Sequence, residues 1–294
     1  MVDKTLSYTS VLREYLALTK PGIVTLVLIT TLGGFYIGAG GILEAVSVFW
    51  TLFGTGLAAA GSAVLNMVLD KDIDSLMERT SHRPLPRGAV SLRGALLLGF
   101  GLLSVSFLSL ALFVNPLASY LTMLASFSYV ILYTVLLKRR TPIATEIGGI
   151  SGALPPVIGY AAASGELDLR ALVLFLIMFM WQPPHFWVLA LKYREDYARA
   201  GVPTLPVARG VFLTKVKTLL YTVSLLPLSL VPYAIGMVGK VYFAVALTLS
   251  VAYTLLTLKF MVSDREYSMK LFFFSVVYIA ILFSVMVLDL SGTR

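Results

Sequence analysis

The sequence predicts an all-α integral membrane protein whose helices cross the bilayer nine times. Its 294 residues are 58% hydrophobic and only 13% charged, and the mean hydropathy is +0.89. Soluble domains average roughly 45–50% apolar and about 25% charged residues, so a soluble fold could not cover this much apolar surface. Apolar stretches of about 20 residues, the length that spans the hydrocarbon layer, also recur along the chain between charged loops.

The expected helices follow from these apolar stretches. The third and fourth are separated only by an Asn-Pro pair at 115–116, which predicts a tight hairpin. Glycine pairs at 33–34, 40–41 and 148–149 and the small residues of 58–62 predict close backbone packing between helices. We expect spans at about 22–40, 45–69, 94–113, 116–137, 143–163, 170–191, 212–235, 239–260 and 269–290.

These spans are expected to form a single transmembrane domain over residues 1–294. Acidic clusters follow the second and the sixth span, which favours two four-helix units with the last span extra. The catalytic loops would then be those at about 66–93, 133–143 and 185–210, on one face of the membrane.

The basic residues predict the orientation. Of the 23 Lys and Arg residues, all but Arg170, Lys240 and Arg294 fall at connections on one side. The positive-inside rule places that side in the cytoplasm, with the N-terminus cytoplasmic and the C-terminus outside. The same asymmetry accounts for the net charge of +8 without nucleic acid. No signal peptide is visible, so we expect a multi-pass prokaryotic plasma membrane protein, or a mitochondrial inner membrane protein if the chain is a mature organellar one.

Polar side chains at the end of the second span predict a metal site. Asn66, Asp70 and Asp74 are spaced four apart and share one helix face, whereas Asp72 points elsewhere. Neighbouring carboxylates repel unless a cation compensates them, and carboxylate and amide oxygens suit Mg²⁺. A solvated helix end balanced by nearby basic residues is the alternative. The stripe begins inside an apolar span, where polar groups are costly and usually functional, and this favours the metal site.

Basic and aromatic side chains at the connections on the same face predict an anion site. Arginine forks and lysine charges bind phosphate oxygens, although each could instead anchor the chain at lipid headgroups. Together with the carboxylates they favour an amphiphilic diphosphate with its head on Mg²⁺ and its tail between helices. The candidates are Arg79, Arg83, Tyr133, Lys138, Arg139, Lys192, Tyr193 and Arg194.

At this point the chain resembles the UbiA superfamily of intramembrane prenyltransferases, whose Asn-x-x-x-Asp-x-x-x-Asp motif is matched by Asn66, Asp70 and Asp74. Within it, the sequence is most similar to the protohaem IX farnesyltransferases, or haem O synthases. The similarity runs from about residue 60 to 210. It rests on stretches at 74–85, 133–139, 148–156, 181–186 and 194–203.

The resemblance implies transfer of farnesyl from farnesyl diphosphate to a vinyl group of haem b, with water supplying a hydroxyl, to give haem O. It implies catalytic roles for Asn66, Asp70, Asp74, Lys192 and Asp196. The metal would lie on Asn66, Asp70, Asp74 and Asp196. A second Asp-x-x-x-Asp of many members is Lys192-x-x-x-Asp196 here, which leaves the number of Mg²⁺ ions open. Delivery of product to a haem A synthase or a terminal oxidase assembly also follows.

His185 is the expected haem-binding residue. It follows Pro183-Pro184, which remove backbone donors from the helix and could present the imidazole to the bundle interior. Imidazole is a common haem ligand; a hydrogen-bonded core histidine and a histidine serving the diphosphate are the alternatives. Glu146 is expected to face the interior, pairing with a loop arginine, with its role open.

Two other functions remain. An aromatic prenyltransferase of quinone biosynthesis would more often carry the second Asp-x-x-x-Asp. A secondary transporter would place its ion-coupling groups near the bilayer midplane, whereas the ionisable clusters here stay at one face. Transport is the least favoured.

Overall fold

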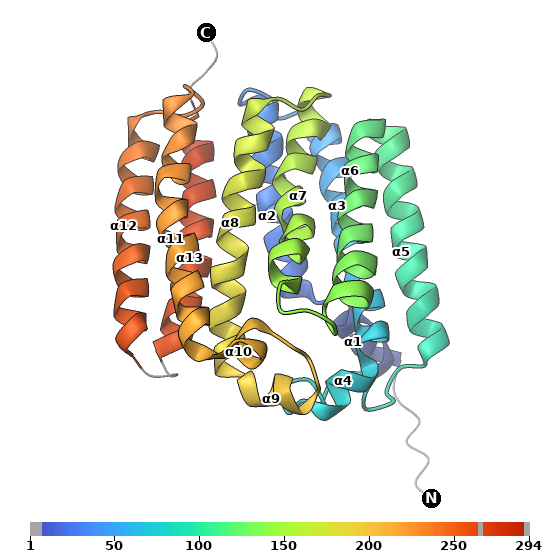
Figure 1. Cartoon of the computed structure of the whole chain (residues 1–294). Helices are drawn as coiled ribbons and strands as arrows, with labels where there is room; N and C mark the ends of the chain where they lie inside the picture. Colours follow the sequence, from blue (N-terminus) through green and yellow to red (C-terminus); the bar gives the residue numbers. More distant parts are fainter. Residues whose placement is uncertain (1–7, 264–266, 291–294) are drawn as a thin grey trace, which may run out of the picture.

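Long apolar helices dominate the fold, because backbone N–H and C=O groups in a bilayer must be bonded within their own segment. The computed structural model describes residues 8–263 and 267–290, which form a helical bundle (Figure 1). Its long helices are α2 (Pro21–Gly38), α3 (Ala45–Leu69), α5 (Leu92–Phe113), α6 (Pro116–Phe127) continued by the π-helix η1 (Ser128–Leu137), α7 (Ala144–Ser164), α8 (Leu169–Lys192), α11 (Gly210–Ala234), α12 (Lys240–Val262) and α13 (Tyr267–Leu288). The short helices are α1 (Tyr8–Leu18), α4 (Lys71–Leu76), α9 (Arg194–Arg199) and α10 (Leu205–Ala208).

The predicted all-α membrane fold is confirmed, with an approximate number of spans. In the described part of the chain, eight helical segments are long and apolar enough to cross a membrane. The remaining long helix, α7, corresponds to the predicted span at 143–163 but is less apolar, because Gly, Ser and Pro residues interrupt its Ile, Leu and Val residues.

The two ends of the bundle differ in character. The short helices α1, α4, α9 and α10 lie together at one end (Figure 1). Helix α4 follows α3 directly and α9 follows α8, so the two acidic segments are carried to the same end. Arg170 and Lys240 lie in the first turns of α8 and α12, where these helices begin at the opposite end. The sequence asymmetry of basic residues is therefore an asymmetry between the ends of the bundle.

Glycine lets α2 and α7 approach closely. A Cβ on Gly34 would lie 1.9 Å from the Pro156 carbonyl oxygen, and one on Gly159 would lie 1.9 Å from the Thr31 carbonyl oxygen. The predicted close packing at 33–34 is confirmed there. The glycines at 40–41 lie instead in the turn that follows α2, where both have positive φ angles, 60° and 90°.

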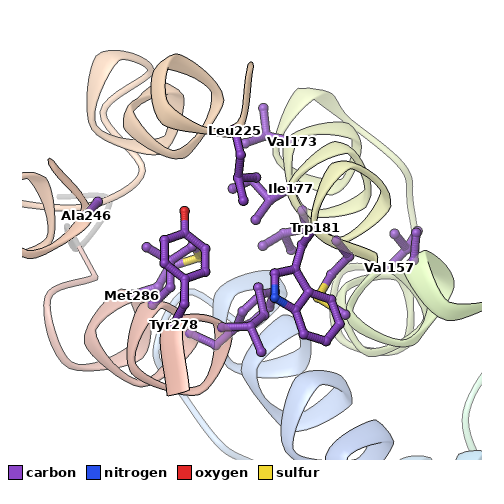
Figure 2. Packing of buried hydrophobic residues seen from close by; sticks show 14 of the residues in the cluster. Val157, Val173, Ile177, Trp181, Leu225, Ala246, Tyr278 and Met286 are labelled. Atoms are coloured by element: carbon purple, nitrogen blue, oxygen red, sulfur yellow. The ribbon is translucent and has the colours of Figure 1, made fainter. Parts of the chain in front are cut away.

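The main hydrophobic core holds α8 in place. Figure 2 shows Ile177 and Trp181 of α8 near Leu225 of α11 and Tyr278 of α13. All four side chains are buried. This packing fixes the rotation of α8 about its axis and hence the direction in which its cavity-facing side chains point.

Candidate active site

A cavity of about 470 Å³ opens between α2, α3, η1, α7 and α8, in the range of ordinary small-molecule sites, about 300–1,000 Å³. All of its charged lining residues come from the bundle end that carries α4. On α3 the lining extends from Asn66 inward to Thr55, about 16 Å along the helix axis at 1.5 Å per residue. Its inner walls are largely Ala, Ile, Leu, Met and aromatic side chains. The cavity thus has one charged pole and a long, mainly apolar interior.

The predicted polar stripe of Asn66, Asp70 and Asp74 continues across the junction between α3 and α4. The backbone N–H of Asp70 donates to the Asn66 carbonyl at 2.9 Å, and that of Asp74 donates to the Asp70 carbonyl at 2.8 Å. Helical spacing therefore continues across the junction, and all three side chains line the cavity while being at most 3% exposed. Asp72 points away, as predicted: it is exposed and pairs with Arg139 at 2.6 Å.

Each buried carboxylate of the stripe has a basic partner from another segment. Lys138 Nζ lies 2.5 Å from Asp70 Oδ2, and Arg83 Nη1 lies 2.6 Å from Asp74 Oδ2. Lys138 follows the last residue of η1. In the wider π-helical turn, the backbone N–H of Lys138 donates to the Tyr133 carbonyl. Such π-helical turns are frequent at functional sites.

Two buried polar atoms at this pole have no hydrogen-bond partner among the described residues. One is Asp70 Oδ1, an acceptor, and the other is Arg79 Nε, a donor. Leaving a buried polar atom unpaired costs about 1–3 kcal/mol. A cation beside the Asp70 oxygen and an anionic oxygen beside the Arg79 nitrogen would remove both penalties.

The donor set fits one hard cation. Asn66, Asp70 and Asp74 supply one amide and two carboxylates to the cavity. The described residues contain no group of three or more His, Cys, Asp or Glu side chains that could hold a metal without an amide or other ligands. Mg²⁺ is commonly held by one or two carboxylates, its remaining positions being filled by waters and substrate phosphates. The residues present therefore fit Mg²⁺ bound together with a diphosphate.

Lys20 joins the pole although the sequence analysis gave it no site role. Its Nζ donates to Asn66 Oδ1 at 2.7 Å, and its backbone, just before α2, has a φ of 51° that non-glycine residues rarely adopt. Burial, together with the positive charges of Arg83 and Lys138, lowers the pKa of Lys20 to about 7. The only local signal was a Lys-Pro pair at the start of a span, which is also typical of a membrane-interface anchor.

Asp196, the expected fourth metal ligand, contacts the loop at 78–79. It does not line the cavity. Its oxygens accept the backbone N–H groups of Glu78 and Arg79 at 3.3 and 3.2 Å, and the Arg199 guanidinium. Burial alone would raise the pKa of this carboxyl, but these three donors outweigh it and hold the pKa below its usual value. Asp196 therefore orders the chain around Arg79.

The residues expected to contact the diphosphate fall into two groups, those that line the cavity and those that do not. Arg79, Arg83, Tyr133 and Lys138 line the cavity, whereas Arg139, Lys192, Tyr193 and Arg194 do not. Lys192 is exposed, and Arg139 is engaged by Asp72 and by the Leu69 carbonyl. Tyr193 contacts a cavity residue, because the Arg79 guanidinium lies 5.2 Å from the centroid of its ring.

His185 lines the same cavity. Helix α8 continues through both prolines, so they do not end it. The imidazole is stacked between the rings of Trp181 and Phe272, with centroids 4.5 and 4.4 Å away. Glu146, by contrast, pairs with Lys217 of α11 at 2.9 Å and not with a loop arginine.

Comparisons with known proteins identify a family. The UbiA prenyltransferase family matches residues 27–282. A relative from Aquifex aeolicus, a protoheme IX farnesyltransferase, is 65% identical over 281 residues, which are 96% of each chain.

Two solved structures share the fold. A digeranylgeranylglyceryl phosphate synthase has a TM-score of 0.79 at 21% identity, over 95% of this chain and 98% of that one. A UbiA homologue from Archaeoglobus fulgidus, bound to GPP and Mg²⁺, has a TM-score of 0.67 at 20% identity, over 93% and 99% of the two chains. At such identities the likeness concerns the fold alone.

Proposed function

The chain belongs to the UbiA prenyltransferase family, and we propose that it transfers the farnesyl group of farnesyl diphosphate to a vinyl group of haem b, with addition of water, to give haem O. The observation that carries the proposal is a cavity whose charged pole holds an unpaired carboxylate oxygen and an unpaired guanidinium nitrogen, and whose apolar interior holds His185. The 65% identical relative supports this choice of donor and acceptor.

At the charged pole, we propose that Asn66, Asp70 and Asp74 hold Mg²⁺, which when bound supplies a Lewis acid for the departing diphosphate. Arg79 and Arg83 bind the phosphate oxygens. Lys20 and Lys138 lie within reach of the same pole through their bonds to Asn66 and Asp70. Asp196 and Tyr193 act through Arg79, which they orient from its backbone and its guanidinium face.

These cations favour ionisation of the allylic C–O bond because they are fixed before the diphosphate charge develops. The stacked rings of Tyr129 and Tyr133, with centroids 5.9 Å apart, line the cavity next to this pole and offer aromatic faces to the allylic cation. The apolar walls beyond them hold the farnesyl chain and exclude bulk water.

The rest of the reaction takes place on the acceptor. A vinyl carbon of haem b forms the new C–C bond with C1 of the farnesyl cation, and the positive charge moves to the carbon next to the porphyrin ring. Water adds there and loses one proton, which leaves a hydroxyl group. We propose that His185 binds the haem, because it is the imidazole that lines the cavity in the described part of the chain.

The membrane setting follows from the charge asymmetry. The chain is a multi-pass membrane protein, and we propose that its charged pole and N-terminus face the cytoplasm, with the C-terminus outside. Farnesyl diphosphate would then enter from the cytoplasmic face. A haem A synthase or a terminal oxidase assembly is the proposed receiver of the product, in a prokaryotic plasma membrane or a mitochondrial inner membrane.

The test is a product assay. The purified chain in nanodiscs would be incubated with haem b, farnesyl diphosphate and Mg²⁺, and the extracted pigments would be separated and weighed by mass spectrometry. We expect a haem heavier by one farnesyl plus one water, absent when EDTA is present. Unchanged haem b, together with prenylation of 4-hydroxybenzoate by the same nanodiscs, would instead favour the quinone branch.

A further inference from the structure

Helix α13 contributes a serine to the surroundings of His185. Ser275 Oγ lies 2.7 Å from His185 Nδ1, across 90 residues of sequence, and Ser275 is fully buried. The Ser275 carbonyl also accepts the indole N–H of Trp181 at 2.8 Å. One residue of α13 therefore contacts both the imidazole and one of the two rings that sandwich it.

The direction of the Ser275–His185 hydrogen bond follows from the other partner of the hydroxyl. Ser275 Oγ donates to the Phe272 carbonyl oxygen at 2.6 Å, and a carbonyl oxygen can only accept. A serine hydroxyl has one proton, and we assign it to the short bond with the Phe272 carbonyl. With the proton there, the bond to the imidazole is donated by Nδ1–H and accepted by Ser275 Oγ.

This direction decides the tautomer of the neutral imidazole. A neutral histidine carries one ring proton, so a protonated Nδ1 leaves Nε2 with a free lone pair. None of the described residues forms a hydrogen bond with Nε2, and His185 lines the cavity. Nε2 is thus the ring nitrogen left for a ligand in the cavity.

We propose that Ser275 is a positioning residue that fixes the Nδ1–H tautomer of His185, so that Nε2 can ligate the iron of the haem substrate. The inference rests on the proposed function for the identity of that ligand. Histidines that bind metals almost always donate their other ring N–H to a protein acceptor, which fixes the ring and raises its basicity. The stack of Trp181 and Phe272 adds a second constraint by fixing the ring plane.

The tautomer can be measured without haem, because the chain has only two histidines, His82 and His185. A His82→Gln variant labelled with ¹⁵N-histidine would leave one imidazole for solid-state NMR in lipid. We expect one protonated nitrogen, Nδ1, in the neutral ring, and a mixture of tautomers after an added Ser275→Ala substitution. A neutral Nε2–H ring in the His82→Gln protein would overturn the proposal, whatever reaction the protein catalyses.

Haem titration then tests the consequence. The optical spectrum of ferric haem added to the full chain should show histidine ligation that His185→Ala removes. Ser275→Ala should weaken haem binding about 10- to 100-fold, and Ser275→Thr, which keeps the hydroxyl, should restore it. The matched control is Ser250→Ala, a buried serine of the same core that contacts Tyr278 and not His185.

Two results of this titration would contradict the proposal while leaving the farnesyl transfer intact. One is a Ser275→Ala protein with the spectrum and haem affinity of the wild type. The other is a His185→Ala protein that keeps the wild-type spectrum, which would show that His185 does not ligate the haem iron. Failure of the proposed function would appear separately, as the absence of a farnesylated haem in the product assay.

Discussion

Asp70→Asn should abolish turnover while Asp72→Asn, two residues away, should not. Asp70 is 1% exposed, faces the cavity and leaves one oxygen unpaired, whereas the Asp72 side chain is 66% exposed and lies outside the cavity. The amide keeps the shape of Asp70 but removes the charge that would hold the cation. Losing one preorganised electrostatic contact to a developing charge costs about 10²–10³ in rate, and we expect at least that loss here.

The same substitution has a cost in stability that must be separated from the rate. It leaves Lys138 without its buried partner, and removing one partner of a buried ion pair costs about 3–5 kcal/mol. The cost should be smaller here, because the Lys138 side chain is 15% exposed. The ion pair of Asp72 with Arg139 is exposed and worth about 0–1 kcal/mol. Adding Lys138→Met to Asp70→Asn should therefore restore the melting temperature but not the rate.

The assay is the initial rate of farnesylated haem formation in nanodiscs at saturating farnesyl diphosphate, with melting followed on the same samples. Asp72→Asn should stay within about threefold of the wild type, since the change of a surface ion pair is small. The reasoning would be refuted if Asp70→Asn kept a rate within that same range, or if the two variants lost activity equally.

Three further outcomes are expected. Lys20→Met should raise the KM for farnesyl diphosphate more than kcat falls, because Lys20 reaches the charged pole through Asn66; an unchanged KM would remove it from the site. Gly34→Val should prevent folding, measured as loss of a monodisperse peak in detergent, because its Cβ would overlap the Pro156 carbonyl; a well-folded variant would contradict the close approach of α2 and α7. Asp168→Ala should lower stability by about 1 kcal/mol, since Asp168 caps α8 through the N–H groups of Arg170 and Ala171. Burial raises the pKa of Asp168, but its hydrogen-bond donors outweigh burial and the net pKa is lowered, so this contribution should be present above the unfolded pKa and vanish as the pH falls through the folded value. If the difference in free energy of unfolding between the wild type and Asp168→Ala stayed constant during acid titration, the cap would not depend on the charge of Asp168.

Features that depend on local periodicity could be predicted from the sequence. The spans follow from runs of apolar residues, and the face shared by Asn66, Asp70 and Asp74 follows from helical spacing alone. The separate direction of Asp72 has the same origin, and the structure confirms it.

Features that depend on contacts between distant segments could not be predicted. Lys20 reaches Asn66 across 46 residues, and Ser275 reaches His185 across 90, and no sequence pattern links either residue to its partner. The surroundings of Asp196 belong to the same group. Its position in the sequence motif predicts a metal ligand, but nothing in that motif predicts the hydrogen bonds that its oxygens accept from the loop at 78–79.

The most direct test of the proposed reaction is a product assay in H₂¹⁸O with haem b and 4-hydroxybenzoate present together. The account predicts a single prenylated product, a haem heavier by one farnesyl and one water, with the hydroxyl oxygen carrying ¹⁸O because it comes from solvent. A farnesylated haem without the isotope would contradict the proposed addition of water. Prenylated 4-hydroxybenzoate with unchanged haem would contradict the acceptor, and with it the role proposed for His185.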